Sequence, residues 1–187
     1  MKTTFKLPKI IKLLMLIALV STGVSCNDKN DKKHENKGTF DGSNSCELIT
    51  ADNIRSVFNL KDGMEIEQTK KLKEICYYKW QSPTQDSLRY SVRFTFSRWE
   101  QKSASDVKKT WQSQNKSVYN DRNLQKVSGV GDNASWSDQD KGQLRVTEDG
   151  YFFYISIYVK PTKKDPMETQ EKIDKASALA KYVIKSM

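Results

Sequence analysis

The clearest pattern in the chain is an alternation of apolar and polar residues between Leu88 and Ser97. A period of two over this length predicts a strand with one buried face and one solvated face. Two apolar alternations flank Asp149-Gly150, a dipeptide typical of tight β-hairpin turns. Besides Leu88–Ser97, the predicted strands are residues 64–68, 74–81, 124–127, 134–136, 143–148 and 151–159.

Three further segments place apolar residues at helical spacing, each behind a residue that can cap a helix. The first predicted helix spans residues 51–60 and is capped by Thr50. The second is capped by Ser103 or Ser105 and ends near Ser117. The last is capped by Asp165, with Pro166 at its first position. The order is a helix, three strands, a helix, three or four strands and a helix. This order predicts an α+β fold with an antiparallel sheet and helices packed on one side of it. One globular domain is expected over residues 46–187.

The first 25 residues have the composition of an export signal. Four lysines and no acids precede the apolar run 13–20, and small residues then lead to Cys26. The segment is too short for a stable membrane span. Val24-Ser25-Cys26 resembles the end of a bacterial lipobox, although Gly23 stands where such boxes carry Leu, Val or Ile. The resemblance implies that Cys26 is acylated, with palmitate among its chains, and becomes the mature N-terminus; the alternative is an ordinary signal peptide with an incidental cysteine.

Residues 26–45 are predicted to form a disordered polar tether behind the lipid. After Cys26 the segment has four lysines, four acids and one large apolar residue, Phe40. Such a composition cannot bury enough surface to offset the entropy of ordering. The segment resembles the charged export tethers of Bacteroidota lipoproteins. We therefore expect the protein in the bacterial cell envelope, anchored to the outer membrane and facing the periplasm or the exterior.

The net charge of +9 overstates the basicity of the domain. The segment 1–25 holds four lysines and no acids, so its removal leaves +5, and the tether is neutral. This weakens the case for nucleic acid, which an exported protein seldom meets. We expect the membrane, through the Cys26 lipid, and an envelope protein or glycan as partners, and no nucleic acid.

With Cys26 assigned to a lipid, Cys46 and Cys76 remain as an even pair in an oxidising compartment. An even pair in that setting indicates a disulfide. The alternative is two separate buried thiols.

Few residues carry catalytic chemistry. His34 is the only histidine, and it lies in the predicted tether. A histidine base or zinc ligand needs fixed geometry, so Ser-His-Asp and Cys-His catalysis and histidine-based zinc sites are not expected. An envelope hydrolase that uses carboxylates or a Ser/Lys pair is the alternative function. We predict no catalytic residues, metal or cofactor.

The strand 151–159 is apolar on one face and aromatic on the other. Phe152, Tyr154 and Tyr158 share the second face, a composition suited to a binding surface. The alternative is a central strand that is covered on both sides. Asp86-Ser87-Leu88 resembles the acceptor site of Bacteroidota O-glycosylation, with Ser87 as the modified residue.

Three short motifs resemble a class of small bacterial lipoproteins. They are Cys46–Thr50, the Cys-aromatic segment Cys76–Trp80, and Val127–Trp136 with its Gly-x-Gly-Asp-x-Ala-x-Trp pattern. The class implies anchoring, a pairing of the two cysteines and a PsbP/Mog1-like sandwich over residues 46–187. It implies no particular activity.

The expected function is therefore a lipid-anchored, non-catalytic binding or accessory module that contacts a protein or glycan. A carrier of a small apolar ligand is a further alternative, and it requires an enclosed apolar cavity.

Overall fold

The computed structural model describes residues 44–98, 103–160 and 165–187. The predicted signal peptide, Cys26 and tether residues 27–43 lie outside the described residues. Within the described ranges, no helix is both long and apolar enough to span a bilayer.

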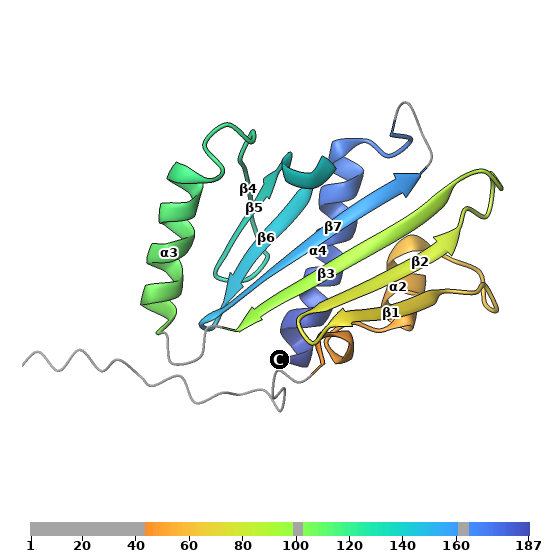
Figure 1. Cartoon of the computed structure of the whole chain (residues 1–187), viewed down its shortest axis with the longest axis horizontal. Coiled ribbons are helices and arrows are strands. Elements are labelled where there is room, and N and C mark those ends of the chain that lie inside the picture. The colour runs from red at the N-terminus through yellow and green to blue at the C-terminus, as the bar shows by residue number, and fades with distance from the viewer. Residues whose placement is uncertain (1–43, 99–102, 161–164) are drawn as a thin grey trace, which may run out of the picture. The chain divides into compact units, whose positions relative to one another are not determined.

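The domain is built on one antiparallel sheet with the strand order β1-β2-β3-β7-β6-β5-β4 (Figure 1). Long-range pairing between β3 and β7 joins the two halves of the chain at the middle of the sheet. The strands are β1 Glu67–Leu72, β2 Ile75–Gln81, β3 Arg89–Arg98, β4 Gln125–Val127, β5 Asn133–Ser137, β6 Gln143–Glu148 and β7 Tyr151–Lys160. The predicted α+β class with helices on an antiparallel sheet is confirmed.

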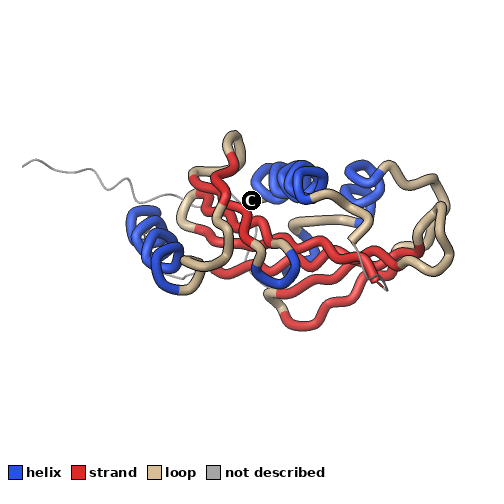
Figure 2. Tube along the Cα trace, turned by 90° about the horizontal axis from the view of Figure 1, so that it is seen from above, coloured by secondary structure: helices blue, strands red, loops and turns tan. Residues whose placement is uncertain are grey.

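Helices cover both faces of this sheet. α2 (Ala51–Phe58) and α4 (Thr169–Ser186) lie on one side, and α3 (Ala104–Ser117) lies on the other (Figure 2). Short 3₁₀ turns, η1 (Ser45–Glu47) and η2 (Gln139–Lys141), precede α2 and β6. The prediction that the helices share one side is therefore wrong for α3, whose apolar stripe contains a single fully buried residue, Val107.

The main core lies between the sheet and α4. Every second residue of β3 and β7 points into it, as Phe94 and Ile155 do at directly paired positions. From α4 it receives Ala176, Leu179 and Val183, all fully buried. Burial of such side chains contributes about 1.5–3 kcal/mol each for the larger ones, so this layer holds the fold together.

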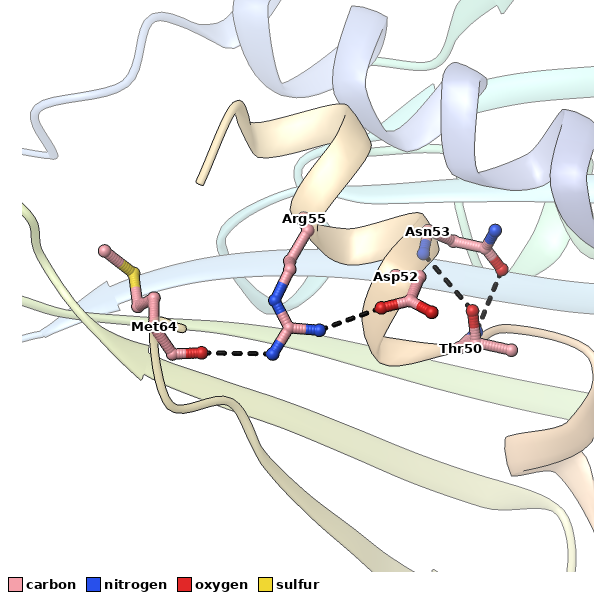
Figure 3. A network of polar contacts seen from close by, with 5 residues as sticks. All are labelled: Thr50, Asp52, Asn53, Arg55 and Met64. Carbon is pink, nitrogen blue, oxygen red and sulfur yellow. Dashed lines mark hydrogen bonds and ion pairs between the residues drawn. The ribbon is translucent and has the colours of Figure 1, made fainter. Parts of the chain in front are cut away.

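The start of α2 follows the predicted capping pattern (Figure 3). The Thr50 hydroxyl accepts a hydrogen bond from the Asn53 amide at 3.2 Å, and the Asn53 side chain accepts one from the Thr50 amide at 2.9 Å. These reciprocal bonds satisfy two backbone donors that the helix leaves free. Arg55 then bridges Asp52 at 2.9 Å and the Met64 carbonyl at 3.1 Å, which fixes the chain that leaves the helix.

A disulfide joins Cys46 in η1 to Cys76 in β2, with their Cα atoms 5.3 Å apart. The pairing expected from the cysteine count is therefore present. The same junction is held by a backbone hydrogen bond of 2.8 Å from Ser45 to Lys73 and by the Tyr78 hydroxyl, which donates to the Ile49 carbonyl. Burial raises the pKa of Tyr78, which keeps this donor protonated.

Two predicted boundaries are wrong. The first strand was expected at residues 64–68, whereas β1 spans Glu67–Leu72 because it pairs with β2 as a polar edge strand. The last helix begins at Thr169, behind Glu168, and not behind Asp165. The Asp165 carboxylate instead accepts from the Met167 amide at 3.0 Å and binds the buried Lys172 ammonium, so it closes a turn before the helix.

Candidate functional site

The sheet face opposite α4 is divided into a covered part and an open part. α3 packs on β6 and β7, where Arg145 is 0% exposed. β1, β2, β3 and the end of β7 extend beyond α3 (Figure 1). The candidate site lies on this second, open part.

Arg145 holds the covered part together. Its guanidinium lies 3.6 Å from the ring centre of Tyr119 and 5.5 Å from that of Phe152. It donates hydrogen bonds to the side-chain carbonyls of Gln114, at 3.0 Å, and Asn115. Burial lowers the pKa of Arg145 below its usual value. Ring faces and amide oxygens thus stabilise a buried cation in place of a carboxylate.

The three residues of the predicted aromatic surface do not lie together in the open. Phe152 is 1% exposed and packs edge-to-face on Tyr154, with ring centres 4.6 Å apart. Tyr154 is half-buried, and burial raises the pKa of its hydroxyl. Tyr158 lies four residues further along β7 on the same face; it is half-buried and belongs to the open part. Among the three, only Tyr158 is placed to meet a ligand.

The open part forms a groove of about 770 Å³, which we call the basic groove. Its floor and walls come from three adjacent strands: Tyr77 and Lys79 on β2, Arg89, Ser91 and Arg93 on β3, and Tyr158 and Lys160 on β7. Asp86 and Ser87 lie at its rim, in the loop between β2 and β3. Four cations and one carboxylate therefore line the groove.

Strand register places Ser91 at the middle of the basic groove. Ser91 pairs with Lys79 on one side and with Tyr158 on the other. Arg89 and Arg93 precede and follow it on the same face of β3. Directly opposite Cβ atoms lie about 4.5–5.5 Å apart, and residues two apart along a strand about 6.8 Å. A short side chain is thus ringed by four long ones, which leaves a pit above Ser91.

Two of the cations are positioned by neighbouring groups. The Lys79 ammonium lies 3.5 Å from a Glu67 carboxylate oxygen at the outer wall. The pKa of Glu67 lies below its usual value because the Thr69 hydroxyl donates to it at 3.0 Å and Lys79 is close. The Arg93 guanidinium lies 5.9 Å from the ring centre of Tyr77, within the range of cation–π attraction.

The basic residues were not identified as site residues from sequence. Arg89 and Arg93 occupy the polar positions of the β3 alternation, which indicate only a solvated face. Their proximity to other cations becomes visible through register, which brings Lys79 from β2 and Lys160 from β7 to the same face. The signal in the sequence was that Arg89 and Arg93 lie on the polar face of the β3 alternation without an acid among its polar positions.

Ser87 is exposed in a well-defined turn at the groove rim. The Ser82 hydroxyl accepts from the amides of Thr84, at 3.3 Å, and Gln85, at 3.2 Å, and the Leu88 amide donates to the Gln85 carbonyl at 2.9 Å. An attached glycan at Ser87 would therefore project beside the groove.

The described residues contain no cluster of three or more His, Cys, Asp or Glu side chains that could hold a metal ion. Comparisons with known protein families, curated proteins and solved structures found no match to this chain.

Proposed function

We propose that the protein is a lipid-anchored, non-catalytic binding module of the bacterial cell envelope, and that its basic groove holds an acidic glycan. One observation carries the proposal. Half of a sheet face is left open, and this half gathers four cations and two tyrosines around a groove of about 770 Å³.

The groove composition favours a saccharide over a purely apolar ligand. Tyr77 and Tyr158 each offer a ring face and a hydroxyl, which suit the C–H face and the hydroxyl groups of a sugar. The cations favour a ligand with negative charge, because an anion bound among several charges of one sign is attracted by all of them. Among the described residues, Asp86 is the only acid that lines the groove, so hydrolysis by paired carboxylates lacks a second acid there.

A glycan is also the anionic polymer that an envelope protein meets. Basic grooves with aromatic residues also suit single-stranded nucleic acid, whose bases stack on ring faces. The export signal argues against nucleic acid as the natural ligand, so nucleic acid becomes an outcome of the test.

The test is binding of the full chain, purified in mild detergent, to chondroitin sulfate, neutral dextran and a single-stranded DNA oligomer. We expect chondroitin sulfate to bind and dextran not to bind. Tyr158→Ala is expected to weaken binding at least tenfold. Tyr182→Ala on α4 is the matched control, since Tyr182 is half-buried and contacts Ser56 away from the groove.

The outcomes separate the alternatives. Equal loss with both tyrosine variants, or no acidic glycan bound, would overturn the proposal. Tighter binding of DNA would replace the glycan with nucleic acid. Release of new reducing ends from the glycan would indicate the hydrolase.

Anchoring is tested separately in cells labelled with palmitate. Wild-type protein is expected to carry the label and sediment with membranes, and Cys26→Ser to lose both. A Cys26→Ser protein that stays membrane-bound would contradict lipid attachment at this residue.

A further inference from the structure

The pit above Ser91 differs from the rest of the basic groove because basic residues lie on several sides of it. Lys79 flanks Ser91 on β2, while Arg89 and Arg93 flank it on either side along β3. Lys160 is paired with Arg89 on β7. Positively charged residues therefore occupy positions on several sides of Ser91, within reach of long side chains.

The shape of this arrangement selects among anions. A carboxylate is planar and presents two oxygens, which one guanidinium fork can satisfy. A sulfate or phosphate ester is tetrahedral and presents three terminal oxygens in different directions. Two arginines and one lysine that occupy three sides of Ser91 can match the tetrahedral group more fully than the planar one.

The charge balance points the same way. Within the groove lining, four cations face one acid, Asp86, and Glu67 at the outer wall partly neutralises Lys79. The remaining excess is about two positive charges. A monoester group, which carries one or two negative charges spread over the terminal oxygens of one sulfur or phosphorus atom, matches that excess.

On this basis we infer that the pit above Ser91 is a subsite for a sulfate or phosphate monoester carried by the glycan, with the sugar ring against Tyr158. This inference rests on the proposed function and specifies its ligand. Tyr158 is directly opposite Ser91, so a sugar whose ester enters the pit would lie over that ring. Tyr77 contacts Arg93 and keeps its guanidinium on the near wall.

The test compares glycans of equal charge density. Chondroitin 4-sulfate and polygalacturonate both average one negative charge per sugar, but only the first carries a sulfate ester. A phosphorylated mannan and a mannan oxidised to carry carboxylates at the same charge density serve as the phosphate arm. We expect the full chain to bind the esterified member of each set at least tenfold more tightly.

Two variants locate the subsite. Ser91→Glu places a carboxylate in the pit and is expected to remove the preference for esters; Gln68→Glu adds the same charge to the exposed β1 surface on the other face and should leave it unchanged. Arg89→Lys retains the charge but removes the fork, so it should weaken the ester ligands at least fivefold and polygalacturonate less. Near-ultraviolet circular dichroism checks that each variant is folded. If Ser91→Glu does not fold, the affinities of Arg89→Lys test the subsite in its place.

Each outcome is decisive. Equal affinity for the sulfated and carboxylated polymers would overturn the subsite while the glycan-binding function stands. A parallel loss for both polymers in Arg89→Lys would show that the guanidinium fork does not distinguish an ester from a carboxylate, which also overturns the subsite. Preference in one arm alone would assign the subsite to sulfate or to phosphate. No binding of any glycan would overturn the proposed function itself.

Discussion

Gly142, between η2 and β6, is a position where a single added methyl group should strongly destabilise the fold. Its φ is +115°, a conformation that residues with a Cβ rarely adopt. Its amide donates to the Gln139 carbonyl at 3.0 Å, which closes the η2 turn. A Cβ here would overlap Cζ2 of the Trp136 indole and lie 2.9 Å from Cη2. Trp136 is 2% exposed, so its ring has little room to move.

The cost of Gly142→Ala has two parts. The backbone conformation contributes roughly 1–3 kcal/mol. Forcing a methyl into a packed ring contributes roughly another 1–3 kcal/mol. The free energy of unfolding should therefore fall by about 2–6 kcal/mol. Gly129→Ala is the matched control, because Gly129 has a φ of +74° and the Cβ of an alanine there would have no neighbouring atom within 4 Å. There only conformational strain applies, at about 1–2 kcal/mol.

Urea unfolding of both variants measures these two costs, and the Trp136→Phe background isolates the clash. Phe lacks the outer ring carbons that the new methyl would meet. Gly142→Ala should therefore cost less in that background, and the difference is the coupling energy of a double-mutant cycle. The reasoning is refuted if Gly142→Ala costs no more than Gly129→Ala, or if Trp136→Phe leaves its cost unchanged.

Two further predictions concern the disulfide and an acidic group. Cys46→Ala with Cys76→Ala should lower the free energy of unfolding by about 3.5 kcal/mol in the chain-entropy model for a sequence separation of 30, as measured by urea titration; a loss under about 1 kcal/mol would contradict it. Burial, with the charges of Asp132 and Asp149, raises the pKa of Glu148. The neutral Glu148 carboxyl stabilises the folded protein. This contribution is fully present below the ordinary pKa of a glutamate and is lost as the pH rises through the raised pKa of the folded state. Glu148→Gln should therefore unfold at a higher temperature than wild type at pH 7 and at a similar one at pH 4; a lower temperature at pH 7 would contradict the assignment.

The secondary structure followed from local patterns where one face of an element is buried. The alternation at Leu88–Ser97 predicted β3 and its faces, because the pleat assigns successive side chains to opposite sides. The Thr50 cap predicted α2, because hydroxyl capping depends only on nearby residues. With Cys26 assigned to a lipid, the two remaining cysteines predicted the Cys46–Cys76 pair, because compartment and parity limit the choices.

Features that depend on tertiary contacts could not be predicted in this way. Asp165 resembles a helix cap in sequence, but its carboxylate binds Lys172, and the helix begins behind Glu168, which makes no capping hydrogen bond with its side chain. The alternation in β7 likewise shows that Tyr154 and Tyr158 share a face, but not that α3 covers the first and leaves the second open. Arg145 accounts for that cover, and no local pattern marks an arginine as buried.

The position of α3 links the stability of the sheet to the proposed binding surface. Its contact with the sheet is largely polar, since Arg145 is fully buried there and Val107 is the fully buried apolar residue of the helix. Such a contact adds less to the core than α4 does, because burial of a cation offsets much of what the contacts contribute. What α3 does is shield Phe152 and Tyr154, which would otherwise extend the open aromatic surface. The cover thereby confines the accessible part of this face to the residues around Ser91, where the cations lie, and so favours a small charged ligand group over a broad apolar partner.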